Sequence, residues 1–112
     1  MDITTQTDGG MATLKVVGRV DAIAMSKLEQ AAGAAIEAGA SRLVIDMRQV
    51  DYISSAGLRA VLMAAKKAQA VGGGIALFGL QPAVEDVMTT SGFATIVRIT
   101  ATEDEARALL SA

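Results

Sequence analysis

The chain has 112 residues, which suits one compact domain, and ten basic against twelve acidic residues give a net charge of −2. This balance, without a long basic run, argues against nucleic-acid binding. The absence of cysteine and histidine excludes disulfides, thiolate chemistry and serine-hydrolase triads, and it leaves only oxygen ligands for a metal. The start of the chain is polar, and no apolar run reaches the roughly 18 residues needed to span a bilayer, so the sequence predicts a cytoplasmic protein without membrane partners. It suggests neither a cofactor nor a metal site.

The first forty residues predict a β-hairpin followed by a helix. Residues 1–7 are rich in threonine, and Asp8-Gly9-Gly10 is a turn signal before a second strand over residues 11–20. Asp21 is placed to cap a helix over residues 22–38, in which apolar residues recur at spacings of three and four.

The middle of the chain predicts a buried strand followed by a long helix. Residues 42–46 are nearly continuous apolar, as expected of a central parallel strand covered on both faces, and Asp46 is expected at its end. An amphipathic helix over residues 55–71 follows, and the three glycines at residues 72–74 end it.

The remainder predicts two strands and two helices. A strand over residues 75–80 precedes a helix that starts at Pro82, and a short strand over residues 95–99 precedes a helix with a capping box at Thr102 and Glu105. The order β, β, α, β, α, β, α, β, α predicts a single α/β domain over the whole chain. Its fold class is a mixed sheet with an N-terminal β-hairpin followed by βα units, with helices packed on the sheet.

The stretch from Asp51 to Arg59 is the expected functional centre. It contains Ser54 and Ser55, which stand where the first backbone N–H groups of the long helix lack intrahelical partners. A hydroxyl in this place either caps the helix or accepts a phosphate group. Most serine pairs before a helix only cap it, so a role as phosphate acceptor needs further support from the surrounding sequence.

Several short segments along the chain carry a resemblance to a known family. They are Gly18-Arg19-Val20-Asp21, Leu43-Val44-Ile45-Asp46-Met47, Tyr52-Ile53-Ser54-Ser55-Ala56-Gly57-Leu58, Gly72-Gly73, Pro82-Ala83-Val84 and Ser91-Gly92-Phe93. Together they resemble the successive landmarks of STAS domains over nearly the whole chain. The chain is most similar to the small stand-alone anti-sigma-factor antagonists of bacteria, which implies a STAS-like fold.

The resemblance implies a switch controlled by phosphorylation. In that family, the unphosphorylated protein binds an anti-sigma factor that is also a serine kinase and makes it release its client, and phosphorylation ends the binding. The matching acceptor here is Ser55, with Ser54 as helix cap and secondary candidate. A serine phosphatase would reset the switch, and the protein itself is not an enzyme. The family's frequent Asp-Ser-Ser-Gly is replaced by Ser54-Ser55-Ala56-Gly57.

The chain order also predicts which residues face such a partner. They should lie on loops or helix ends around the acceptor: Asp21, Asp51, Tyr52, Ser54, Ser55, Gly57 and Arg59. A phosphate on Ser55 adds about −1.5 to −2 charges. Peptide dipoles at a helix start tolerate this charge, whereas a partner packed on it must bury or repel it. The effect is therefore expected in the interface, with the fold unchanged.

Two alternatives remain. The chain could be a STAS subunit fixed in a larger assembly, such as a stress complex, a chemosensory array or a lipid-transport machine. It could instead be a receiver-like phosphoacceptor at Asp46, if Asp21 and Asp51 converge with it to hold Mg²⁺. The receiver pattern needs an acidic pair after the first strand and a lysine after a later one, and this sequence has only Asp21 and no such lysine.

Overall fold

The computed structural model describes residues 1–92 and 97–111 and contains five strands and four helices in these ranges. The strands are β1 (Asp2–Asp8), β2 (Met11–Val20), β3 (Arg42–Ile53), β4 (Gly74–Phe78) and β5 (Arg98–Thr100). The helices are α1 (Met25–Glu37), α2 (Ser55–Ala70), α3 (Pro82–Thr90) and α4 (Glu103–Ser111).

The strands form one mixed sheet in the order β1-β2-β3-β4-β5. β1 and β2 are antiparallel and joined at Gly9 and Gly10, whose positive φ values of 56° and 84° suit glycine in a tight turn. The pairs β2–β3, β3–β4 and β4–β5 are all parallel, and a helix connects the strands of each pair, as the crossover between parallel neighbours requires. The predicted fold class, a leading hairpin followed by βα units, is confirmed.

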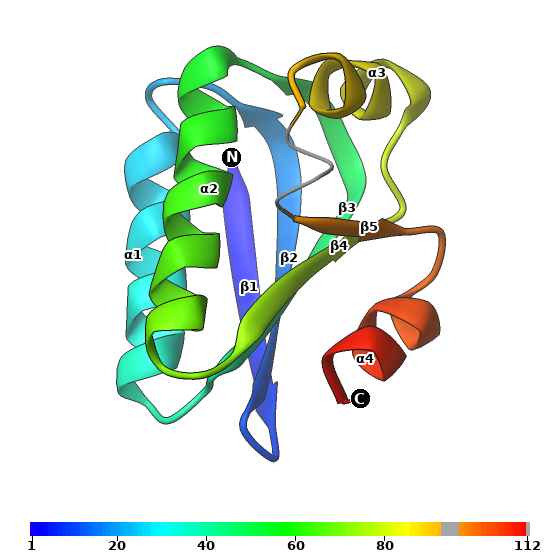
Figure 1. The fold of residues 1–112 in the computed structure, drawn as a ribbon. Coiled ribbons are helices and arrows are strands. Elements are labelled where there is room, and N and C mark those ends of the chain that lie inside the picture. Colours follow the sequence, from blue (N-terminus) through cyan, green and yellow to red (C-terminus); the bar gives the residue numbers. More distant parts are fainter. Residues whose placement is uncertain (93–96, 112) are drawn as a thin grey trace.

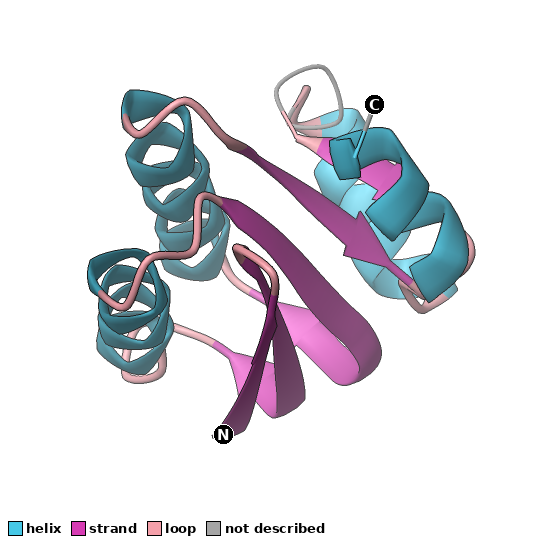
Figure 2. Ribbon diagram, turned by 90° about the horizontal axis from the view of Figure 1, so that it is seen from below, coloured by secondary structure: helices cyan, strands magenta, loops and turns pink. Residues whose placement is uncertain are grey.

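Helices cover the two faces of the sheet unequally, as Figures 1 and 2 show. The helices α1 and α2 lie side by side on one face, above a large aliphatic core that includes Leu14, Ile45 and Leu77. On the other face α4 covers a smaller core around Val44 and Phe78. Helix α3 packs against β3. The face beneath α1 and α2 thus holds most of the apolar burial that stabilises the fold.

Strand β3 continues well beyond the predicted end at Asp46, so that prediction was wrong. Its pairing with β2 shifts register twice, first between Lys15 and Val17 and again between Gly18 and Arg19. At each shift β3 contains one residue more than β2 opposite it, as in a β-bulge. The extra residues break the two-residue alternation of buried and exposed side chains, and for this reason the second half of β3 resembles a loop in the sequence.

The predicted helix starts agree with the structure except at α1. This helix begins at Met25 and not at residue 22, because residues 22–24 form a turn. The predicted last strand over residues 95–99 begins outside the described ranges, and β5 covers residues 98–100. Phe93, part of the family resemblance, also lies outside the described ranges. In the described part of the chain, every helix is too short or too polar to span a lipid bilayer.

Candidate functional site

The end of β3 and the start of α2 form a tightly bonded corner with the end of β2. Ser54 is the N-cap of α2, and its Oγ accepts a hydrogen bond of 3.1 Å from the backbone N–H of Gly57. The backbone N–H of Ser54 donates to the carbonyl oxygen of Val20 at 2.9 Å, and its hydroxyl approaches the same oxygen at 3.4 Å. The prediction that Ser54 caps the helix is therefore confirmed.

Gly57 sits at the closest approach between α2 and β2. A Cβ atom on this residue would lie 2.3 Å from the carbonyl oxygen of Val20 and 2.9 Å from side-chain atoms of Val20 and Ile53. Any side chain here would push α2 away from the sheet. The structure buries Gly57, contrary to the expectation that it faces a partner, because its role is to let two backbones meet.

Ser55 is the first residue of α2 and is exposed to solvent. Since Ser54 already supplies the cap, the hydroxyl of Ser55 is not needed for the helix, and it has no hydrogen-bond partner among the described residues. Two serines that are adjacent in sequence are thus divided by geometry into an engaged hydroxyl and a free one. A free hydroxyl at an exposed helix start is accessible to an enzyme that transfers phosphate.

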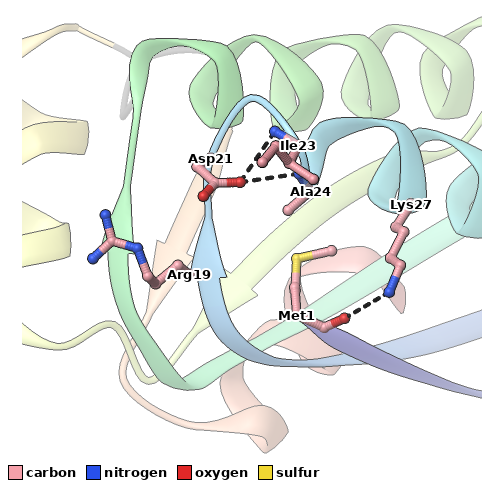
Figure 3. A pocket seen from close by; sticks show the side chains of 6 residues that line it. All are labelled: Met1, Arg19, Asp21, Ile23, Ala24 and Lys27. Atoms are coloured by element: carbon pink, nitrogen blue, oxygen red, sulfur yellow. Dashed lines mark hydrogen bonds between the residues drawn. The ribbon is translucent and has the colours of Figure 1, made fainter.

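The turn between β2 and α1 lies next to this corner, and Asp21 holds its shape. Figure 3 shows that Oδ1 of Asp21 accepts hydrogen bonds from the backbone N–H groups of Ile23 and Ala24, at 3.1 and 3.0 Å. Asp21 therefore caps the turn that precedes α1, and not the first turn of the helix as predicted. Because this oxygen is engaged twice, Asp21 supports the surface more than it offers a free charge.

Two exposed residues near the corner were missed by the sequence reading. Ile23 is 89% exposed at the tip of the turn, and it lines a hollow of about 240 Å³ together with Arg19 and Lys27, seen in Figure 3. The guanidinium of Arg19 also lies 4.1 Å from the ring centre of Tyr52 in a cation–π contact. The register that pairs Arg19 with Tyr52 depends on the irregularities in β3, so no sequence signal indicated this contact.

The other predicted residues lie near Ser55 in the chain, at the end of β3 and in the first turns of α2. Tyr52 is 41% exposed, and Asp51 is an exposed extra residue at the second register shift of β3. Arg59 is exposed one helical turn after Ser55. The corner therefore combines Ser55 with an aromatic ring, an acidic side chain and a cation.

Asp46 lies apart from this corner, in the middle of the sheet. Its side chain is 6% exposed and forms an ion pair with Arg48, with Oδ2 to Nη2 at 2.8 Å and Oδ1 to Nε at 3.0 Å. Burial by itself raises the pKa of Asp46, but the hydrogen bonds and charge of Arg48 outweigh it and hold that pKa below its ordinary value. The same pair raises the pKa of Arg48.

This arrangement does not bring Asp21, Asp46 and Asp51 together, which the alternative of a receiver-like site required. Asp46 is opposite Lys15 and Phe78 in the sheet, whereas Asp51 lies near the far end of β3 and Asp21 holds its own turn. Nowhere in the described residues do three acidic side chains gather in a way that could hold a metal ion. The geometry therefore does not support a receiver-like site at Asp46, because its carboxylate is buried and already bonded.

Comparison with known proteins identifies a family whose sequence model matches this chain and several relatives. A sequence model of the STAS domain matches residues 2–106. The protein BtrV of Bordetella bronchiseptica, named as a candidate anti-sigma factor antagonist, is 36% identical over 108 residues, which are 96% of this chain and 93% of BtrV.

Solved structures show the same fold. A candidate anti-sigma factor antagonist from Thermotoga maritima superposes with a TM-score of 0.89 at 18% identity, over 98% of this chain and 95% of that one. The Bacillus cell fate determinant SpoIIAA in its phosphorylated form superposes with a TM-score of 0.72 at 20% identity, over 94% of this chain and 96% of the other. At these identities the likeness concerns the fold alone.

Proposed function

The chain belongs to the STAS domain family, and from this premise we propose that it is an anti-sigma-factor antagonist switched by phosphorylation of Ser55. Unphosphorylated, it binds a cytoplasmic anti-sigma factor with serine kinase activity, and the anti-sigma factor releases its client. The kinase then phosphorylates Ser55 and the complex separates. A serine phosphatase restores the binding form. The protein is the substrate of these enzymes, and it supplies no catalytic group of its own.

The observation that carries this proposal is the free hydroxyl of Ser55 at the exposed start of α2. Ser54 caps the helix, so Ser55 can accept a phosphate group without loss of a structural hydrogen bond. Relatives support the same role: BtrV is named as an antagonist, and one solved neighbour, SpoIIAA, was obtained in a phosphorylated form. In this chain the residue matching the family's acceptor is the one left free by the geometry.

The proposed partner surface surrounds Ser55. It consists of the exposed side chains of Asp51, Tyr52, Ser55 and Arg59, with part of Ser54. Asp21 and Gly57 support this surface from behind, through the turn and the contact with Val20. A charged phosphate in the middle of such an interface must be buried or repelled by the partner, and an uncompensated charge can cancel the gain of a modest interface. The fold itself needs no rearrangement.

The first test locates the phosphate. The protein is incubated with ATP and each purified kinase-type anti-sigma factor of its source organism, and the modified peptide is identified by mass spectrometry. We expect one phosphate on Ser55, none in a Ser55→Ala variant, and undiminished labelling in Ser54→Ala at a temperature where that variant is folded. If Ser55 stays unmodified with every such kinase, the proposed switch is wrong.

The second test measures the interface by titration calorimetry. Ser55→Ala should bind the anti-sigma factor as tightly as the unmodified protein, whereas Ser55→Asp should bind at least about tenfold more weakly, which equals about 1.4 kcal/mol. Ser111→Asp, which makes the same change of charge at the end of α4, is the control and should bind normally. Equal affinities for the Ser55→Ala and Ser55→Asp variants would contradict the charge mechanism.

A further inference from the structure

Ser55 and Arg59 share one exposed strip of α2. They are four residues apart, the spacing at which side chains of an α-helix lie one above the other. Both are exposed, while Gly57 and Leu58 between them are buried against the sheet. The acceptor hydroxyl and the guanidinium are therefore neighbours on the same outward face of the helix.

Arg59 differs from the other arginines of the chain in having no partner among the described residues. Each of the other five has a recorded contact: Arg19 with Tyr52, Arg42 with the carbonyl of Gly9, Arg48 with Asp46, Arg98 with the carbonyl of Leu109, and Arg107 with Glu103. No hydrogen bond, ion pair or ring contact is recorded for Arg59 in the described part of the chain. Its guanidinium is thus uncommitted.

The helix surface around Arg59 offers it no acid. The residues three and four positions away along α2 are Ala56, Ser55, Leu62 and Met63, and the first turn of α2 contains no acidic side chain. Of these four neighbours, only Ser55 can become an anion, and only by modification. The pairing of Arg59 within its own helix therefore depends on the state of Ser55.

We propose that Arg59 is this chain's own partner for a phosphate on Ser55, so that phosphorylation closes a Ser55–Arg59 ion pair along α2. An acid that precedes a base by four residues is the favoured orientation of such a pair in a helix. A phosphate brings three acceptor oxygens, and the planar guanidinium binds them in a two-pronged manner that a lysine cannot reproduce. In the unmodified protein the guanidinium stays free.

This pair deepens the proposed function and rests on it. Arg59 belongs to the surface that we propose for the anti-sigma factor, where its free cation is available to an acidic group of the partner. Phosphorylation would then change that surface twice, by adding an anion at Ser55 and by withdrawing the cation of Arg59. The partner loses an attraction and gains a repulsion in a single step.

The test installs the phosphate without the kinase. Phosphoserine is incorporated at position 55 by genetic encoding, and the titration of its phosphate is followed by ³¹P NMR in the full chain. Arg59→Gln should raise the midpoint of this titration by about 0.3 pH unit, because a pair of this kind stabilises the dianion by roughly 0.4 kcal/mol. The midpoint of Arg59→Lys should lie between those of the unsubstituted protein and of Arg59→Gln, since lysine keeps the positive charge but cannot form the two-pronged contact of the guanidinium.

Lys66→Gln is the matched control. Lys66 is an exposed cation on the same helix, eleven residues from Ser55 and so about 16 Å along the axis, beyond the range of screened charges. Its loss should move the midpoint by less than about 0.1 pH unit. The proposed Ser55–Arg59 ion pair would be wrong if Arg59→Gln left the midpoint unchanged, or if Arg59→Gln and Lys66→Gln shifted it equally. Neither result depends on a kinase, so a failure here differs from a failure of the proposed function.

Discussion

Two oxygen-bearing side chains near β3 show how differently one strand uses its polar groups. The carboxylate of Asp46, in the middle of the strand, is 4% exposed as a residue and fully engaged by Arg48. The hydroxyl of Ser55, two residues beyond the end of the strand, is exposed and has no recorded partner in the described chain. In the sequence Asp46 was an alternative phosphoacceptor, but in the structure its carboxylate is held in an ion pair. Whether a side chain can react therefore depends on the hydrogen bonds and ion pairs that it already forms, and not on its chemical type alone.

The strongest way to break the corner that presents Ser55 is to give Gly57 a side chain. Gly57→Ala should lower the free energy of unfolding by about 2–3 kcal/mol, because its Cβ meets the backbone oxygen of Val20, which cannot swing aside as a side chain could. Chemical denaturation measures the loss. Partner binding should also weaken, since α2 must shift relative to β2.

Gly33→Ala in α1 is the control for this substitution. Among the described residues outside the backbone of its own helix, a Cβ there meets the end of the Lys67 side chain at 3.8 Å, and alanine favours the helix interior. We expect this variant to gain about 0.5–1 kcal/mol of stability. Similar effects of the two substitutions would show that the contact between Gly57 and Val20 is not tight.

Arg48→Met tests whether the buried carboxylate of Asp46 depends on its ion pair with Arg48. This change leaves Asp46 buried without its guanidinium, and we expect a lower free energy of unfolding at neutral pH, measured by chemical denaturation. Arg59→Met, which removes an exposed arginine without a recorded partner in the described residues, should stay within about 0.5 kcal/mol.

The loss in Arg48→Met should depend on pH. Arg48 holds the folded-state pKa of Asp46 below its ordinary value, so in the native protein the carboxylate contributes stability above that ordinary value, and this is lost as the pH falls through the folded-state pKa. Without the guanidinium, the carboxylate keeps only the backbone N–H of residue 48 and the charge of Lys15 among the recorded causes that favour its charged form, so the cost of its burial is less well compensated. The difference between the two proteins should therefore shrink as the pH falls through the carboxyl range, and a constant difference would contradict this account.

The smallest expected effects separate the two serines. Ser54→Ala removes the hydrogen bond to the N–H of Gly57 and should cost about 1 kcal/mol, the usual effect of losing an N-cap. Ser55→Ala removes no recorded bond of the described structure and should change stability by less than about 0.5 kcal/mol. Thermal unfolding of the two variants makes the comparison, and a larger loss for Ser55→Ala would reverse the roles assigned to them.

Most of the fold was predictable because local signals agreed with the global arrangement. Asp8-Gly9-Gly10 indicated the hairpin, and apolar periodicity indicated α1 and α2. The capping box of α4 is present in part: the N–H of Glu105 donates to the hydroxyl of Thr102, but the carboxylate accepts from that same hydroxyl and not from a backbone N–H.

The parts that were missed depend on register and on contacts between distant segments. The length of β3 was underestimated because its two extra residues disturb the alternation, and this error placed Asp46 at a strand end. Gly57 was assigned to the surface because nothing in the local sequence shows that Val20 lies against it. Ser54 was assigned correctly as the cap of α2, since capping is a local property that a short stretch of sequence contains, whereas the role of Ser55 stays a prediction.

The length of β3 also has a consequence for how the molecule opens. Up to Asp46 the strand is hydrogen-bonded to β2 on one side and to β4 on the other. Beyond Asp46, among the described residues, its pairing partner is β2, and the side-chain amide of Gln81 donates to the carbonyl oxygen of Arg48. A segment with one bonded edge unfolds locally at lower cost than one with two. We therefore expect slower amide exchange in residues 42–46 of β3, which pair on both sides, than in the part of β3 that follows, and Ser55 comes shortly after that second part.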